Sequence, residues 1–197
     1  INEFVDAVRT VMPAALLQWE DFRKDNALEI LEHHRGEILS FNDDIQGTGA
    51  VTLAGLFCAL RISGGVLTEQ RIVIHGAGAA GLGIARQIKA ALAEAGLDAG
   101  DIQQRLAVLD IRGLLVDDQP FRDAYKSELA WESHLAERHG LSAPQHRGLE
   151  EVIENYKPSI EIDSSWKMLE LNDLCSKITK GSTPTTYKHE FKNKGIN

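Results

Sequence analysis

The sequence lacks the features that mark several common classes of protein. Its two cysteines, Cys58 and Cys175, have no disulfide-framework or metal-site spacing, so we expect reduced thiols that serve in packing. The apolar runs are short and interrupted by charges, which predicts that no helix spans a membrane. No charged segment followed by an apolar stretch opens the chain, so no secretory signal is visible. Together these absences favour a cytoplasmic protein.

An excess of basic charge is also missing. The 197 residues include 21 Lys+Arg and 29 Asp+Glu, a net charge of −8, which argues against a dedicated nucleic-acid binder. The charge is uneven, however. Residues 1–158 hold all 11 arginines and sum to 15 − 24 = −9, whereas residues 159–197 hold six lysines and sum to 6 − 5 = +1. This change predicts two pieces of different origin, joined between Glu150 and Pro158.

Apolar spacing predicts the elements of the first piece. We expect an amphipathic helix over residues 4–11, a strand over 15–19, a helix over 27–34 capped by Asn26, and a buried helix over 48–62. A polar helical stretch is expected over 124–138. His33 and His34 fall at a helix end, and we favour a solvated cap over a metal-binding pair because adjacent residues do not face each other on a helix.

The clearest signal is a strand, a glycine-rich turn, a helix and a second strand in that order. The strand 71–75 leads into the motif GAGAAG at 76–81, a helix follows over 82–95, and the strand 105–110 ends on Asp110. In this context GxGxxG is typical of dinucleotide binding. Gly76 permits a tight turn, Gly78 lets the backbone approach a pyrophosphate, and Gly81 lets the helix pack on the strand. The alternative is a turn that only packs a helix on a sheet.

Two acidic pairs precede this motif, each directly after an apolar run. They are Glu20-Asp21 and Asp43-Asp44. Hard cations such as Mg²⁺ prefer carboxylate oxygens, and three carboxylates from these pairs could hold one. Taken alone, acidic pairs are more often solvated turns or helix caps.

Residues 1–157 resemble the malic enzyme family. The similar segments are LLQWEDF at 16–22, FNDDIQGT at 41–48, the glycine loop, and Asp110 with 113–115. They occur in the family's order and spacing, in what would be the middle of a much longer enzyme. The resemblance implies an α/β fold, with part of an N-terminal metal and substrate domain over 1–44 and a partial Rossmann-type NAD(P)-binding domain over 45–157.

The resemblance also implies an activity, the oxidative decarboxylation of L-malate to pyruvate and CO₂ with reduction of NAD or NADP. The family needs Mg²⁺ or Mn²⁺, which polarises the malate hydroxyl and stabilises the enolate. Glu20, Asp21 and Asp44 match its metal ligands, and Asp43 matches the neighbouring acid that organises the site. Its cofactor-binding positions match Gly76, Ala77, Gly78, Ala79, Ala80, Gly81 and Asp110. A homo-oligomer is usual in the family.

Coenzyme choice depends on two residues. Asp110 favours the free 2′-hydroxyl of NAD because a carboxylate repels a 2′-phosphate, whereas Arg112 could pair with that phosphate. The balance favours NAD over NADP.

These 197 residues lack the family's general-acid Tyr and general-base Lys motifs. Proton transfer by a positioned side chain is worth about 10²–10⁴-fold in rate, so we expect the chain alone to be inactive or nearly so. The alternative is a truncated or fused product that at most binds nucleotide.

Residues 158–197 form the second piece. Their segments WKMLEL at 166–171 and KITKGSTP at 177–184 resemble the start of a target-recognition domain in the specificity subunit of type I restriction enzymes. The alternative is a polar, lysine-rich tail. This piece has too few apolar residues to bury a core of its own, so we expect neither independent folding nor specific DNA binding.

Overall fold

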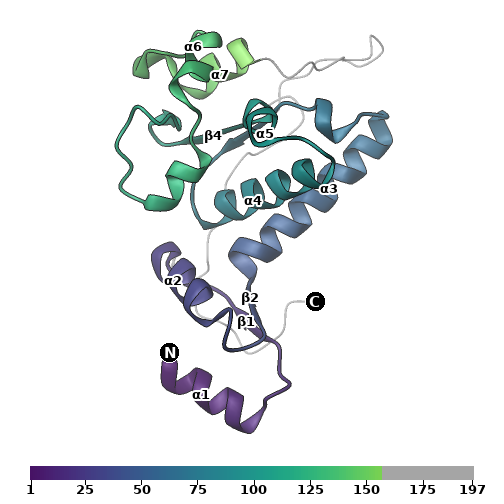
Figure 1. The fold of residues 1–197 in the computed structure, drawn as a ribbon, viewed down its shortest axis with the longest axis vertical. Coiled ribbons are helices and arrows are strands. Elements are labelled where there is room, and N and C mark those ends of the chain that lie inside the picture. The colour runs from purple at the N-terminus through teal and green to yellow at the C-terminus, as the bar shows by residue number, and fades with distance from the viewer. Residues whose placement is uncertain (157–197) are drawn as a thin grey trace, which may run out of the picture. The chain divides into compact units, whose positions relative to one another are not determined.

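The computed structural model describes residues 1–156, and the predicted α/β class is confirmed (Figure 1). The predicted tail, 158–197, and its resemblance to a specificity subunit lie outside the described residues. The helices are α1 Asn2–Val11, α2 Lys24–His34, α3 Thr48–Ser63, α4 Ala79–Glu94, α5 Ala99–Arg105, α6 Ser133–Arg138 and α7 Leu149–Tyr156. The strands are β1 Leu17–Trp19, β2 Ser40–Asn42, β3 Ile72–His75, β4 Leu106–Asp110 and β5 Gly113–Leu114. Short turns of other helix types are η1 Asp43–Gly47, η2 Leu67–Glu69, η3 Ala124–Leu129 and η4 Pro144–His146.

The first sheet is a parallel pair, β1 and β2, with α2 as the connection between them. Leu17 lies opposite Ser40 and Trp19 opposite Asn42, so both strands end at the same edge. Trp19 is buried with Val5 of α1 and Ile30 of α2. This small core holds the two acidic runs that directly follow the strands.

The second sheet has the order β3-β4-β5 and carries the predicted βαβ unit. β3 and β4 are parallel, with Ile74 opposite Val108, and the two-residue β5 is antiparallel to β4. The segment before β4 forms α5, a helix that the sequence patterns do not predict. This helix lengthens the stretch between the glycine loop and Asp110.

Strand β4 is buried on both faces, as expected for a strand covered by helices on both sides. Leu106 and Val108 face one apolar cluster that includes Leu82, Ile88 and Leu92 of α4. The alternate residues face a second cluster, which contains Trp131, Leu135 and Tyr156 with Ala107 and Leu109. The two clusters fix the position of the carboxyl end of β4, where Asp110 lies.

Close contacts at glycine bring α4 against α3 and η1. A Cβ on Gly83 would lie 1.8 Å from the Ile45 carbonyl oxygen, and one on Gly49 would lie 2.6 Å from the Gly83 carbonyl oxygen. Figure 1 shows α3 and α4 side by side. Because Ile45 belongs to η1, this contact links the glycine loop's helix to the second acidic run.

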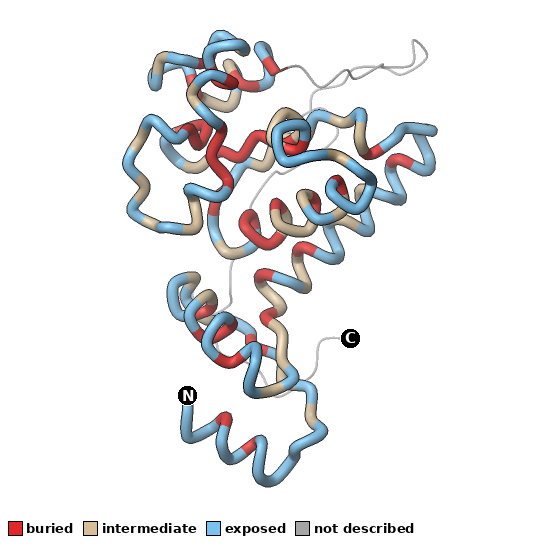
Figure 2. Tube along the Cα trace, in the orientation of Figure 1, coloured by how far each residue is buried: buried red, intermediate tan, exposed pale blue. Residues whose placement is uncertain are grey.

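The predicted bounds of α3 are confirmed, but its predicted burial is wrong. Only Gly49 and Leu60 of this helix are buried, whereas Ile62 is 88% exposed and Cys58 is exposed rather than packed. Figure 2 shows most of α3 in pale blue. The apolar residues recur around the whole helix, and in the described residues the neighbouring elements cover one narrow face of it.

The same helix bears on the predicted absence of a membrane span. Within residues 1–156, the helical stretch Asp43–Ser63 is long and apolar enough to cross a membrane by length and composition alone, and 17% of its most apolar window is buried. This stretch is therefore a longer apolar run than the sequence analysis assumed, and the absence of a membrane-spanning helix stays a prediction.

Two predicted helices differ from those observed. α2 begins at Lys24 with Arg23 as its N-cap, so Asn26 lies inside the helix and does not cap it. The predicted helix over 124–138 divides into η3 and α6. Trp131 lies between these two elements, with its indole N–H donating to the Leu106 carbonyl oxygen at 2.7 Å, so tertiary packing interrupts the helix.

Candidate nucleotide and metal site

The glycine loop has the backbone geometry that each predicted glycine requires. Gly76 has φ +132°, a conformation that L side chains rarely adopt. Gly78 is the N-cap of α4, and a Cβ there would meet no atom within 4 Å. A Cβ on Gly81 would lie 1.7 Å from the Gly76 carbonyl oxygen, so only glycine lets α4 approach the turn. The first amides of a 16-residue helix are therefore presented over an open position.

The loop's three alanines complete the turn into α4. Ala79 and Ala80 form the first turn of the helix. Ala77 is buried, and its carbonyl oxygen accepts a hydrogen bond from the Tyr125 hydroxyl at 2.9 Å. Tyr125 comes from η3, so a segment nearly 50 residues further along the chain holds the glycine loop through this hydrogen bond.

Asp110, the predicted ribose-binding acid, lies at the end of β4 with both carboxylate oxygens engaged. Oδ1 accepts from the Arg112 amide at 2.7 Å, and Oδ2 accepts from the Lys126 ammonium at 2.7 Å. Partial burial alone would raise the pKa of Asp110, but the Lys126 ammonium and the Arg112 amide hold it below its ordinary value. The acid is therefore ionised at neutral pH and already shares its charge with a cation.

The ion pair continues into a chain of alternating charges that reaches α2. Lys126 also lies 3.6 Å from Asp123, and the Asp123 carboxylate accepts from Lys24 at 2.5 Å. The hydrogen bond from Lys24 lowers the pKa of Asp123, and the same bond raises the pKa of Lys24. This chain of charges connects the N-terminal part of the molecule to the nucleotide-binding part.

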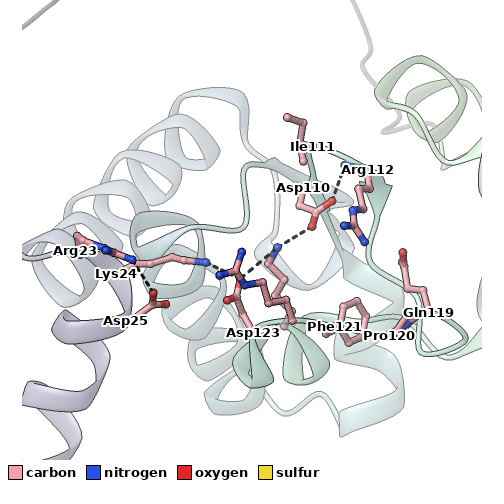
Figure 3. A pocket seen from close by; sticks show the side chains of 12 residues that line it. Arg23, Lys24, Asp25, Asp110, Ile111, Arg112, Gln119, Pro120, Phe121 and Asp123 are labelled. Atoms are coloured by element: carbon pink, nitrogen blue, oxygen red, sulfur yellow. Dashed lines mark hydrogen bonds and ion pairs between the residues drawn. The ribbon is translucent and has the colours of Figure 1, made fainter.

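These charges line a cavity of about 270 Å³ (Figure 3). Asp110 and Arg112 point into it from the end of β4, and Arg23 and Lys24 come from the start of α2. Its remaining lining includes Phe121 of the segment before η3. The cavity combines an acid that can accept from a ribose diol with cations that can contact phosphate, so its lining suits a nucleotide.

The acidic runs meet where β1 and β2 end. The Asp44 carboxylate accepts a hydrogen bond from the Asp21 backbone amide at 2.9 Å, which brings the two runs together across 23 residues of sequence. Asp21 has φ +60°, and it is the one non-glycine residue with positive φ in the described residues. Such strain is concentrated at functional sites.

The second acidic run is part of a π-helical turn, η1, which is another feature common at functional sites. Asn42 caps this turn, because its side-chain oxygen accepts from the Ile45 amide at 2.9 Å. The Gln46 side chain accepts from the Asn42 amide in return, also at 2.9 Å. The turn fixes the backbone of Asp43 and Asp44 at the edge where Glu20 and Asp21 lie.

The donor set of this edge suits a hard divalent cation, but its conformation is not that of a closed site. Glu20 and Asp21 are exposed, and the Glu20 carboxylate accepts from the Gln18 side chain at 2.9 Å. Asp43 and Asp44 are half-buried. Within the described residues, these carboxylates do not form a group whose oxygens all lie within 4.8 Å of one another. The backbone brings the acids to one edge, and Glu20 would have to turn inward to share a metal.

The interpretation of the two adjacent histidines as a solvated cap is wrong for His34, which is 3% exposed. The rings of His33 and His34 meet edge to face, with centroids 4.6 Å apart. Both residues belong to the last turn of α2 and differ in burial, because His33 is exposed whereas His34 lies against buried Trp19.

Sequence reasoning missed four residues of the site. Lys24, Asp123, Tyr125 and Lys126 all act through contacts between segments separated by 16 to 101 residues. These residues are visible in the sequence, but no local pattern indicates which of them pair across such separations.

Sequence comparison relates both the N-terminal residues and the nucleotide-binding residues to one enzyme family. Residues 45–172 match the family model "Malic enzyme, NAD binding domain", and residues 1–35 match "Malic enzyme, N-terminal domain". The chain is 44% identical over 165 residues to the NAD-dependent malic enzyme of Erwinia tasmaniensis, covering 84% of this chain and 29% of that protein. It is 39% identical over 171 residues to the mitochondrial NAD-dependent malic enzyme of Saccharomyces cerevisiae, covering 84% of this chain and 24% of that one.

Solved structures agree with the sequence comparison. The NAD-dependent malic enzyme of Thermotoga maritima superposes with a TM-score of 0.56 at 25% identity, over 78% of this chain and 37% of that one. The malic enzyme of Pyrococcus horikoshii superposes with a TM-score of 0.52 at 32% identity, over 66% and 31%. The chain thus spans 29% of the Erwinia relative's length and about a third of these structures.

Proposed function

Because this chain belongs to the malic enzyme family, we propose that it forms the central part of an NAD-dependent enzyme that oxidatively decarboxylates L-malate with a divalent metal. The observation that carries the proposal is the pairing of two features in one unit. The βαβ unit presents its open helix N-terminus and Asp110, and the β1–β2 edge presents carboxylates from both acidic runs. The contact between Gly83 and Ile45 holds these features together.

The chain's residues have distinct tasks in this reaction. The amides at the start of α4 bind the pyrophosphate, with Gly78 leaving room for it. Asp110 accepts hydrogen bonds from the ribose. Glu20, Asp21 and Asp44 would hold Mg²⁺ or Mn²⁺, and Asp43 would orient them. When bound, the metal supplies charge that acidifies the malate hydroxyl and stabilises the enolate.

We infer that these 197 residues bind cofactor but do not turn over malate by themselves. The family's general-acid Tyr and general-base Lys motifs have no counterpart in the sequence. A positioned proton donor and acceptor contribute about 10²–10⁴-fold in rate. Incubation of the chain with L-malate, NAD and Mn²⁺ should therefore give no NADH absorbance above a metal-free control, and sustained NADH formation would contradict this inference.

The nucleotide half of the proposal is tested by calorimetric titration with NAD. Asp110→Asn removes the charge that holds the ribose, and we expect about tenfold weaker binding of NAD, since one hydrogen bond to a charged group is worth ~1.5 kcal/mol or more. Asp101→Asn, an exposed acid in α5, is the matched control and should bind NAD like the unmodified chain. Equal affinity of all three proteins would refute the assignment of Asp110.

The metal half is tested separately by titration with Mn²⁺. Asp44→Asn should weaken Mn²⁺ binding about tenfold or more, because a carboxylate ligand becomes a neutral amide. Asp6→Asn, on the exposed face of α1, is the control that should leave Mn²⁺ binding unchanged. An Asp44→Asn variant with unaltered affinity would show that the metal binds elsewhere.

A second, narrower candidate is a chain that binds nucleotide only. The exposure of Glu20 and Asp21 favours it, because these carboxylates are not gathered in the described conformation. This candidate predicts normal NAD binding together with Mn²⁺ binding that Asp44→Asn does not weaken.

The malic enzyme domain match runs to residue 172 and includes the segment 166–171. We therefore propose a DNA-specificity-subunit origin only for residues 173–197, which lie outside the described residues, and without retained specific DNA binding. A duplex-binding titration at moderate salt should show no preference among sequences, and a salt-resistant preference would contradict the proposal.

A further inference from the structure

A second cluster of metal-ligating side chains lies at the end of α2, apart from the acidic edge. His33 and His34 are the last two residues of the helix, and Glu37 follows in the turn. One donor atom from each lies within 4.8 Å of the other two. Among residues 1–156, no other three histidine, cysteine, aspartate or glutamate side chains bring their donor atoms this close together.

The local backbone explains why the three side chains meet. After His34 the chain turns back on itself, and the Glu37 amide donates to the His34 carbonyl oxygen at 2.9 Å. This turn brings the Glu37 carboxylate to 2.7 Å from Nδ1 of His34. The His33 ring meets the His34 ring edge to face. The cluster thus results from a helix end and a tight turn.

The cluster has one rigid member and two adjustable ones. The His34 side chain is 4% exposed, and its ring centroid lies 6.1 Å from that of buried Trp19, so its position is fixed by the core. His33 and Glu37 are exposed, and their side chains can rotate. A tetrahedral zinc site needs donors about 3.4 Å apart, from metal–nitrogen bonds of about 2.0–2.1 Å. Small rotations of the two exposed side chains would give that spacing.

We propose that His33, His34 and Glu37 bind one divalent cation of the zinc type. Two imidazole nitrogens and one carboxylate oxygen suit Zn²⁺ and its neighbours in the transition series, whereas Mg²⁺ prefers oxygen ligands alone. The cation would take the place of the proton that now lies between His34 and Glu37. It differs in ligand chemistry from the cation proposed for the acidic edge, and it does not depend on the proposed enzymatic function.

The surroundings favour a bound cation. The carbonyl end of α2 adds partial negative charge. Two cations lie near the cluster, and each is paired with an acid: Arg35 with Glu32 at 3.3 Å, and Arg9, whose charge acts on Glu37, with Asp6 at 3.8 Å. Both histidines also line a cavity of about 340 Å³, which leaves room for water as a fourth ligand.

A bound ion would join the end of α2 to the turn that leads into β2. β2 ends at Asn42, directly before the second acidic run. We therefore expect Zn²⁺ to raise the thermal unfolding midpoint of the chain, because an ion that binds only the folded state stabilises it.

The test is calorimetric titration of the full chain with ZnCl₂ in a large excess of Mg²⁺, which occupies oxygen-only sites. His33→Ala removes an exposed ligand, and Glu37→Gln removes the charge while its amide oxygen can still accept from His34. His134→Ala is the matched control, since His134 is an exposed histidine 3.1 Å from Glu132. Asp44→Asn is the control for the acidic edge.

We expect one Zn²⁺ per chain, with affinity reduced about tenfold or more in His33→Ala and in Glu37→Gln. His134→Ala and Asp44→Asn should keep both the affinity and the zinc-dependent rise in unfolding midpoint. The proposal is overturned if the unmodified chain binds no zinc under these conditions, or if His33→Ala and Glu37→Gln bind it equally well. A loss confined to His134→Ala would reveal adventitious surface binding, and a loss confined to Asp44→Asn would place the zinc at the acidic edge. Both of these results also overturn the proposal.

Discussion

At the scale of single residues, the ion pair of Lys126 and Asp110 affects whether the nucleotide cavity favours a ribose with a free 2′-hydroxyl or one with a 2′-phosphate. Lys126 neutralises the acid across 2.7 Å and leaves its ammonium at the cavity wall. A ribose diol must share Asp110 with this cation, whereas a 2′-phosphate would be attracted to Lys126 and repelled by Asp110. The two charges therefore act in opposite directions on coenzyme choice.

This opposition predicts the effect of Lys126→Met, which keeps the side chain's length and removes its charge. NADP binding should weaken about tenfold, as expected for the loss of one charge-assisted contact of ~1.4 kcal/mol. NAD binding should change by less than about threefold, because two effects oppose each other. The substitution frees one carboxylate oxygen of Asp110 for the ribose, and it also removes a positive charge from the cavity. Parallel calorimetric titrations with the two coenzymes measure the ratio, and an unchanged ratio would exclude Lys126 from coenzyme choice.

A second residue-scale prediction concerns pH. Arg147 is 2% exposed and donates two hydrogen bonds to Asp118, at 2.7 and 2.6 Å. These hydrogen bonds lower the pKa of Asp118 in the folded state. The stabilisation is complete above the unfolded-state pKa of about 3.9 and is lost as the pH falls through the lower folded-state value.

Asp118→Asn should therefore lower the free energy of unfolding at neutral pH by about 1–2 kcal/mol, a value reduced because Asp118 is partly exposed. Urea unfolding at pH 7 and at pH 3 measures this difference. The effect of the substitution should shrink at the acidic pH, and an equal or larger effect there would contradict the role of the ion pair.

At the scale of elements, glycine contacts determine where α4 lies. Gly83→Ala would place a Cβ 1.8 Å from the Ile45 carbonyl oxygen, and we expect a loss of about 3 kcal/mol in unfolding free energy. Gly55→Ala in α3 is the matched control, because its Cβ would meet nothing within 4 Å. There the helix propensity of alanine should add about 0.5–1 kcal/mol. Urea denaturation compares the two, and similar changes would disprove the close packing of α4 on η1.

The exposure of α3 leads to a second prediction for this helix. Leu60 is 8% exposed and packs into the larger core, whereas Ile62 is 88% exposed. Leu60→Ala should cost about 2–4 kcal/mol, and Ile62→Lys should change the unfolding free energy by less than about 0.5 kcal/mol. Thermal or urea unfolding checks the contrast. A large cost for Ile62→Lys would mean that another part of the protein covers this face.

Element types and most bounds could be predicted from the sequence because they depend on local periodicity and on turn residues. The strand at 71–75, the helix that follows Gly81 and the helix from Thr48 are all found within a few residues of their predicted bounds. Burial of α3 could not be predicted, because an all-round apolar pattern says nothing of what lies beside the helix. The same limit applies to Lys126 and Asp110, whose pairing requires the fold.

At the scale of the whole molecule, the described residues combine the nucleotide-binding unit around β3 and β4 with the acidic edge of the smaller β1–β2 sheet. The acidic runs could be found from the sequence because each follows a strand, and the parallel register of β1 and β2 explains why they meet. Their final geometry could not be predicted, because it depends on the strained backbone of Asp21 and on the capping of η1 by Asn42.

The account's central claim is that NAD binds across the open start of α4, and Gly78→Val tests it most directly. The substitution adds a side chain where a Cβ would meet nothing within 4 Å, so circular dichroism should be unchanged, and the unfolding midpoint should fall only slightly because valine is a poorer N-cap than glycine. The pyrophosphate would lose its place, and calorimetric titration should show NAD binding weakened at least about tenfold. A folded Gly78→Val variant that binds NAD as tightly as the unmodified chain would contradict the claim.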